Sequence, residues 1–111
     1  MSIVFLNNRG FIKLELGQIE EGKDDIDLSI TKDPTNAWAY RNKGWYYFKA
    51  GKPEDALKLL KRSAKLDPFV DKVYLLMGQV YESMGDAAKA CENYKLAIER
   101  KENVVTELIC P

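Results

Sequence analysis

Two consecutive stretches of equal length decide the fold of this chain. Residues 37–70 read AWAYRNKGWYYFKAGKPEDALKLLKRSAKLDPFV, and residues 71–104 read DKVYLLMGQVYESMGDAAKACENYKLAIERKENV. Residues 3–36 fit the same register more weakly. The glycines coincide in all three units, with Gly10, Gly44 and Gly78 at one position and Gly17, Gly51 and Gly85 at another. Self-similarity at a fixed period of 34 residues indicates a repeat architecture.

Each unit reads as a pair of helices. Residues 37–50 carry apolar side chains at helical spacing. Gly51 ends this first helix, because glycine tolerates a positive φ, and Pro53 suits the first turn of the next helix. The second helix stops before Asp67, because the residue that precedes a proline disfavours the helical region. The sequence therefore predicts antiparallel helix hairpins.

These units resemble tetratricopeptide repeats. That family places an aromatic residue or leucine, a glycine and a tyrosine on the first helix, a glycine in the turn, and small residues around a large one on the second helix. The matching residues of the middle unit are Tyr40, Gly44, Tyr47, Gly51, Ala56, Leu60, Ser63 and Pro68, and those of the last unit are Tyr74, Gly78, Tyr81, Gly85, Ala90, Tyr94 and Ala97.

The resemblance implies an all-α fold, a right-handed superhelical solenoid of three antiparallel helix hairpins with a short C-terminal helical tail. We expect a single domain over residues 1–111, with repeats at 3–36, 37–70 and 71–104 and a capping or tail segment at 105–111. Glu102 stands where the earlier units close with proline. The last helix therefore either runs on or gives way to a short new helix, which folds back as a cap or packs against a second copy.

The composition excludes several classes of function. Lys and Arg number 17, Asp and Glu number 17, and histidine is absent. The equal numbers of basic and acidic residues argue against nucleic acid and anionic membranes as partners. The absence of histidine removes the commonest general base and zinc ligand. We therefore expect no enzyme, no catalytic residue, no metal and no cofactor. The two cysteines, Cys91 and Cys110, are interpreted as free thiols, which favours a cytoplasmic location.

The family resemblance implies that the first helices line a concave groove. On the middle first helix, Trp38, Asn42, Trp45 and Lys49 share one side, and the equivalent stripe of the first unit is Val4, Asn8, Phe11 and Glu15. We expect both tryptophans to face the groove, although they can instead pack as ordinary core. The candidate peptide-binding residues are Asn8, Phe11, Trp38, Arg41, Asn42, Trp45, Lys49, Lys72 and Gln79.

Three residue types motivate this assignment. Tryptophan and arginine dominate the energetics of protein interfaces. An asparagine amide such as that of Asn42 offers a donor and an acceptor to one peptide unit. A related subgroup of the family holds the terminal carboxylates of chaperone tails, but only Asn42 and Lys72 match its five positions, so we do not expect that ligand.

The sequence thus favours a protein–protein interaction module that binds a peptide or protein segment in its groove. The alternative is an assembly adaptor that forms a homodimer through the ends of its solenoid.

Overall fold

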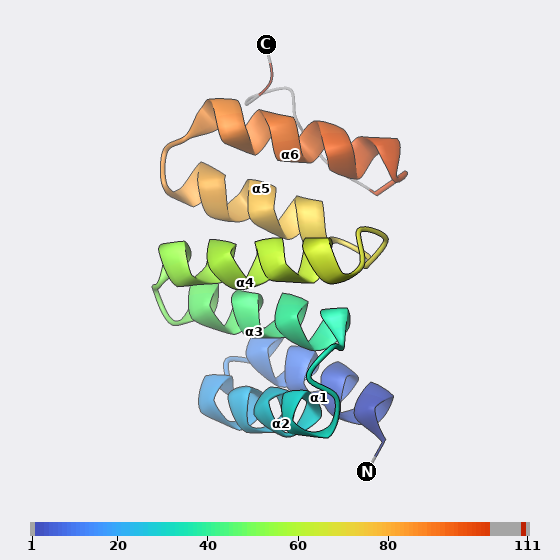
Figure 1. Ribbon diagram of the computed structural model, residues 1–111. Helices are drawn as coiled ribbons and strands as arrows, with labels where there is room; N and C mark the ends of the chain where they lie inside the picture. The colour runs from blue at the N-terminus through green and yellow to red at the C-terminus, as the bar shows by residue number, and fades with distance from the viewer. Residues whose placement is uncertain (1, 103–109, 111) are drawn as a thin grey trace. The chain divides into compact units, whose positions relative to one another are not determined.

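In the computed structural model, the described residues, 2–102 and 110, form six α-helices and no strand (Figure 1). The helices are α1 (Ile3–Glu15), α2 (Ile19–Lys32), α3 (Ala37–Lys49), α4 (Pro53–Leu66), α5 (Val73–Ser83) and α6 (Ala87–Glu99). They pair as α1 with α2, α3 with α4 and α5 with α6. The predicted all-α fold of helix hairpins is confirmed.

The helix boundaries follow from side-chain chemistry. Asn36 is the N-cap of α3, and its Oδ1 accepts a hydrogen bond from the Ala39 N–H at 3.2 Å. Gly51 has a φ of 80°, a left-handed conformation that glycine adopts without a side-chain clash. Pro53 occupies the first position of α4, as predicted.

The contacts divide the chain into two compact units, Met1–Val70 with α1 to α4 and Asp71–Pro111 with α5 and α6. In the first unit, α3 packs against α1 and α2 as well as against α4. The first unit therefore contains two stacked hairpins, which is the arrangement that a repeat array needs to bury its apolar faces.

Small residues allow the helices of each hairpin to approach closely. A Cβ added to Gly44 would lie 2.8 Å from Leu60 Cγ, and one added to Gly78 would lie 2.4 Å from Tyr94 Cε1. Leu60 and Tyr94 are themselves almost completely buried. The repeating glycines thus serve packing between paired helices, which leaves other positions of α1, α3 and α5 for function.

The last helix does not run on. α6 ends at Glu99, and Lys101 adopts a left-handed φ of 62° that turns the chain. The N–H of Glu102 then donates to the carbonyl of Ala97 at 3.1 Å, which closes the helix end without a proline. Of the predicted tail at 105–111, only residue 110 lies inside the described residues.

The interpretation of the cysteines as free thiols is wrong. Cys91 and Cys110 form a disulfide, and their Cα atoms lie 5.2 Å apart although 19 positions separate them in the sequence. The number of cysteines alone did not reveal this spatial proximity. The prediction of a cytoplasmic location therefore loses the free thiols as its support. Among the described residues, none of the six helices combines the length and the hydropathy of a membrane-spanning segment.

Candidate binding site

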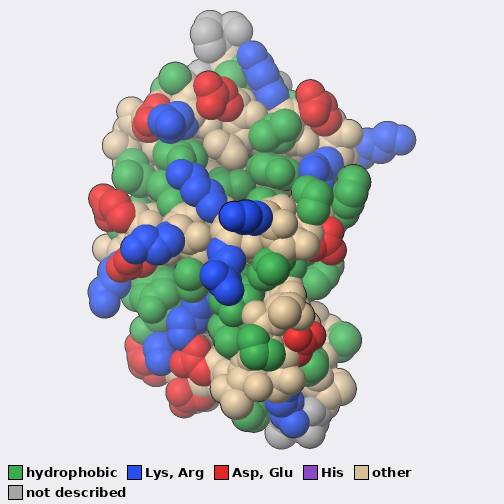
Figure 2. Space-filling model, viewed as in Figure 1, with side chains coloured by type: hydrophobic (Ala, Val, Ile, Leu, Met, Phe, Trp, Pro, Cys, Tyr) green, Lys and Arg blue, Asp and Glu red, His purple; other side chains and the backbone are tan. Residues whose placement is uncertain are grey.

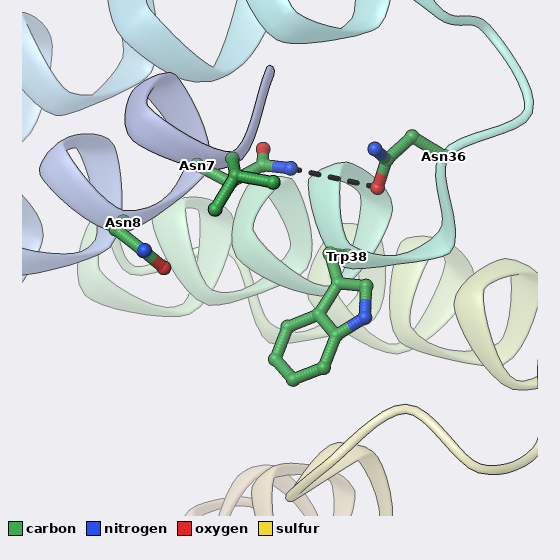
Figure 3. A pocket seen from close by; sticks show the side chains of 5 residues that line it. Asn7, Asn8, Asn36 and Trp38 are labelled. Atoms are coloured by element: carbon green, nitrogen blue, oxygen red, sulfur yellow. Dashed lines mark hydrogen bonds between the residues drawn. The ribbon is translucent and has the colours of Figure 1, made fainter. Parts of the chain in front are cut away.

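A pocket lies between α1 and the start of α3, inside the unit Met1–Val70 (Figure 3). Its volume is about 260 Å³. Val4, Asn7 and Asn8 come from α1, Asn36 precedes α3, and Trp38 stands in the first turn of α3. None of these five side chains is charged. The pocket therefore combines an indole and an aliphatic group with three carboxamides.

The pocket has an open mouth and a buried amide. Trp38 is 41 % exposed and Val4 is 69 % exposed, whereas Asn7 is only 5 % exposed. The Nδ2 of Asn7 donates to Asn36 Oδ1 across a long distance of 3.5 Å, drawn as the dashed line in Figure 3. The Oδ1 of Asn7 is buried and accepts no hydrogen bond from the described residues. A buried carbonyl oxygen without a donor is costly, and this one has almost no accessible surface, so it is a cost of forming the pocket wall and not a group that a ligand reaches.

A stacked arginine holds the indole of Trp38 in place. The Arg41 guanidinium carbon lies 4.6 Å from the ring centroid of Trp38 and 4.9 Å from that of Phe11. Two nitrogens of Arg41, Nε and one terminal nitrogen, donate to Asn42 Oδ1 at 3.1 and 2.9 Å. A cation between two aromatic rings is favourable, and the planar guanidinium fits this position well. Arg41 therefore orients Trp38 at the edge of the pocket.

The same network ties α3 to α1. Asn42 donates from Nδ2 to the backbone carbonyl of Asn7 at 3.0 Å, while its Oδ1 receives the guanidinium of Arg41. Asn42 is 1 % exposed and Arg41 is 7 % exposed. We expected the Asn42 amide to face a ligand, but it is buried, and both of its polar atoms find partners inside the unit.

Trp45 also differs from expectation. Its indole N–H donates to Glu15 Oε1 at 2.5 Å, and its ring stacks on Phe48 with centroids 4.8 Å apart. Lys49 Nζ lies 5.4 Å from the same ring. Only 7 % of Trp45 is exposed, so the expectation that both tryptophans face an open groove is wrong for this one. The partner of its indole is an acid on α1, 30 positions earlier in the sequence.

The remaining predicted residues fall into two groups. Asn8 is exposed at the pocket, and Phe11 is half-buried under Arg41. Lys72 and Gln79 belong to the second unit. The backbone N–H of Lys72 donates to a carboxylate oxygen of Glu102 at 2.9 Å, and the Gln79 side chain is exposed.

Three residues of the pocket, Val4, Asn7 and Asn36, were not among the predicted binding residues, although Val4 stood on the predicted groove stripe of the first unit. Asn36 stands immediately before the first helix of the middle repeat, where a capping residue is expected, and this position was the available signal. Asn7 occupies the repeat position of Arg41, itself a predicted binding residue, and this equivalence was the available signal.

The carboxylate of Asp25 in α2 forms ion pairs with two basic residues of α1. The buried Asp25 accepts from Arg9 at 2.7 Å and lies 3.2 Å from Lys13 Nζ. The hydrogen bonds from Arg9 hold the pKa of Asp25 below its usual range, outweighing the opposing effect of burial. This pair fixes α1 against α2 and so supports the α1 wall of the pocket.

No cluster of three or more metal-ligating side chains occurs among the residues that the structure describes. The residues that line the pocket are an indole, an aliphatic side chain and three carboxamides, which allow stacking, apolar contact and neutral hydrogen bonds.

Comparison with protein families identifies two segments of the chain. Residues 26–58 and residues 71–104 each match a family model described as tetratricopeptide repeat. The first match begins in α2 and ends in α4, so it covers the whole of α3 together with parts of α2 and α4. The second coincides with the predicted third repeat.

Curated relatives are much longer than this chain. The chain is 33 % identical over 75 residues to Hsp70-Hsp90 organizing protein 1 of Glycine max, which aligns 68 % of this chain with 13 % of that protein. It is 24 % identical over 102 residues to Superkiller complex protein 3 of Homo sapiens, which aligns 90 % of this chain with 6 % of that protein. The chain thus spans only a small part of these relatives.

Solved structures agree on the fold. A crystal structure of MamA protein has 27 % identity and a TM-score of 0.74, covering 90 % of this chain and 55 % of that one. MamA from Desulfovibrio magneticus RS-1 has 19 % identity and the same TM-score, covering 93 % and 59 %. The two repeat matches together span more than half of the sequence, and the helix hairpins and neighbours agree with them. This chain therefore belongs to the tetratricopeptide repeat family.

Proposed function

We propose that the chain is a non-catalytic protein-interaction module whose α1–α3 surface binds an extended segment of a partner protein. Membership of the repeat family and the MamA-like fold support an interaction or scaffold role in general. The pocket between α1 and α3 is where we expect the partner segment to be anchored. The partner itself is a protein or peptide.

The observation that carries this proposal is a tryptophan held in place yet open to a ligand. The indole of Trp38 is stacked by Arg41 and is still 41 % exposed. An aromatic anchor that is already ordered loses little conformational entropy when a partner binds, which is the benefit of preorganisation. Beside it, Asn8 presents an exposed carboxamide that can both donate and accept hydrogen bonds.

In this proposal the predicted residues divide into two roles. Asn8 and Trp38 contact the partner directly, because both line the pocket and are exposed. Arg41 and Asn42 act as positioning residues, because they link Trp38 to the backbone of α1. Phe11 supports the guanidinium from the other side.

A library of displayed random peptides tests the proposal without knowledge of the natural partner. We expect the intact chain to enrich peptides that bind it, and we expect the Trp38→Ala variant to lose them. The matched control is Phe69→Ala, which removes an 82 % exposed aromatic ring outside the pocket. Enriched peptides that bind the Trp38→Ala variant as well as the intact chain would refute the proposed site.

A second candidate function, assembly through an end of the repeat array, has its own observation. Phe5 and Ile12 of α1 are 49 and 56 % exposed, and Leu16, which follows the helix, is 68 % exposed. On α3, the repeat equivalent of Ile12 is Tyr46, which is buried and whose hydroxyl lies 3.1 Å from Glu20 of α2. The outer stripe of α1 thus matches a stacking surface and suits a second copy of the chain.

Light scattering distinguishes this second function from the first. Self-association through α1 predicts a dimer that the Ile12→Lys variant converts to a monomer. A monomeric intact chain at high concentration would exclude the dimer and leave peptide binding as the remaining function.

A further inference from the structure

We propose that the outer face of α4 is a second docking surface, which binds an acidic segment of a partner protein. The surface is a row of three basic side chains, Lys58, Arg62 and Lys65, called the basic stripe below. None of them lines the pocket between α1 and α3, so this inference goes beyond the proposed function and does not depend on it.

The geometry of α4 turns the basic stripe away from α3. The buried Ser63 of α4 faces α3, because its hydroxyl donates to the Ala37 carbonyl at 2.7 Å. The three residues of the stripe are exposed instead. Their spacings of four and three residues place them on one side of the helix. Three cations therefore lie in a row along about two helical turns, open to solvent.

Carboxylates of the described residues leave the charge of the basic stripe unpaired. Residues 37–70 hold eight basic and three acidic side chains. In the neighbouring helices, Arg9 of α1 pairs with Asp25 of α2 at 2.7 Å. Lys43 of α3 pairs with Asp27 of α2. No described carboxylate forms an ion pair with the stripe, so its positive charge is available to attract the carboxylates of a partner.

Arg62 is held in position for a carboxylate. Its guanidinium carbon lies 4.8 Å from the ring centroid of Tyr40. The Tyr40 hydroxyl donates to the Pro34 carbonyl at 2.8 Å, which anchors the ring. A guanidinium presents its N–H groups in a planar fork that matches the two oxygens of a carboxylate. Because its side chain is already ordered, Arg62 loses less conformational entropy when it binds a partner.

The neighbouring acidic surface favours a protein segment over larger anions. Figure 2 shows basic side chains over α4 and acidic side chains over α2 on the same face of the unit that contains both helices. The exposed acids of α2 are Glu20, Glu21 and Asp24. A DNA duplex or an anionic membrane is broader than one helix, so it brings negative charge against these acids. An acidic protein segment contacts α4 alone.

Peptide probes test this docking surface on the full chain. The acidic probe is a capped peptide of six glutamates with an uncharged fluorophore, and the control probe carries six glutamines instead. In anisotropy titrations at low salt we expect a Kd about tenfold lower for the glutamate peptide, because three exposed ion pairs together contribute a difference of this size. Added salt should weaken this binding, because it screens exposed charges. Tighter binding of a short DNA duplex, or co-sedimentation with vesicles that contain phosphatidylserine, would overturn the inference.

Two variants with the same change of charge locate the bound peptide. The test variant replaces the three residues of the basic stripe with glutamine, and we expect a Kd about tenfold higher for the glutamate peptide. The control variant replaces three exposed lysines outside α4, namely Lys32→Gln, Lys95→Gln and Lys101→Gln. We expect its Kd to stay within about twofold of the intact value, because these lysines do not contact the peptide. Equal losses in the two variants, no loss in the test variant, or equal binding of the glutamine peptide would each overturn the inference.

The Trp38→Ala variant keeps this test apart from the proposed function. We expect it to bind the glutamate peptide as the intact chain does, because Trp38 belongs to the pocket and not to the basic stripe. A loss of binding in this variant would place the acidic peptide in the pocket and overturn the inference. Failure of the acidic peptide to bind at all would also overturn it, while library peptides that depend on Trp38 would still support the proposed function.

Discussion

Replacing Asn42 with alanine removes the link between the two helices of the site. Three hydrogen bonds are lost, two from Arg41 to Oδ1 at 3.1 and 2.9 Å and one from Nδ2 to the Asn7 carbonyl at 3.0 Å. Asn42 is 1 % exposed, so water does not readily replace these partners. The Asn7 carbonyl becomes a buried acceptor that has lost this donor, and the guanidinium loses its acceptor at Oδ1.

The expected decrease in the free energy of unfolding follows from the loss of these hydrogen bonds. The Asn7 carbonyl keeps its helical hydrogen bond within α1, so the neutral bond from Asn42 contributes about 0.5–1.5 kcal/mol, and the hydrogen bonds to the charged guanidinium contribute about 1.5–3 kcal/mol. The aromatic contacts of Arg41 with Phe11 and Trp38 retain part of its stabilisation. We therefore expect Asn42→Ala to lower the free energy of unfolding by about 3 kcal/mol.

Urea unfolding followed by tryptophan fluorescence measures this loss in the relevant unit. Both tryptophans, Trp38 and Trp45, lie in α3, so their emission reports on the unit Met1–Val70. The control is Asn93→Ala, whose amide bonds only within α6 and whose effect we expect within about 0.5 kcal/mol of zero. A change below about 0.5 kcal/mol for Asn42→Ala would refute the assignment of Asn42 as a structural link.

Three further changes test the packing, the charges and the covalent link. Gly78→Ala gains about 1 kcal/mol of helix propensity but forces a Cβ against the buried ring of Tyr94, so we expect net destabilisation of roughly 1–2 kcal/mol, measured by thermal unfolding. Because the folded-state pKa of Asp25 is lowered by Arg9, its ionic stabilisation is complete above the unfolded pKa of about 3.9 and disappears as the pH falls through the folded pKa. Asp25→Asn should therefore be less stable than the intact chain at neutral pH, and urea titrations should show that difference shrinking below about pH 4; a constant difference would contradict it. Cys91→Ser removes a disulfide across 19 positions and should lower the free energy of unfolding by about 3 kcal/mol in non-reducing buffer, whereas an equal stability would argue against the disulfide.

The sequence predicted the helices well because their determinants are local and repeat. Each determinant acts within a few residues of its own position. Examples are the glycine turns at Gly51 and Gly85, the proline at the start of α4 and the N-cap at Asp86. The end of α6 was harder, because Lys101 adopts a left-handed conformation that glycine usually takes in this position.

The site was predicted only in part, because its partners belong to different repeats. Helical spacing placed Trp38 and Trp45 on one side of α3, but it did not reveal that Glu15 would accept from the indole of Trp45. Likewise, the burial of Asn42 depends on the backbone of Asn7, which lies 35 positions away. Periodicity assigns a residue to a face, whereas the exposure of that face depends on how closely neighbouring helices approach.

The disulfide between Cys91 and Cys110 illustrates a different limit. Two cysteines in a chain of 111 residues carry no spacing pattern that distinguishes a disulfide from two free thiols. Only the Cα separation of 5.2 Å shows that they meet.

The most direct test of whether the pocket between α1 and α3 anchors a partner is a calorimetric titration. One enriched peptide is titrated onto the intact chain, onto the Trp38→Ala variant and onto the Phe69→Ala variant. Loss of an aromatic anchor costs about 2 kcal/mol or more, which corresponds to a Kd about 30-fold higher. We predict that increase for Trp38→Ala and an unchanged Kd for Phe69→Ala. A Kd for Trp38→Ala within twofold of the intact value would contradict the account.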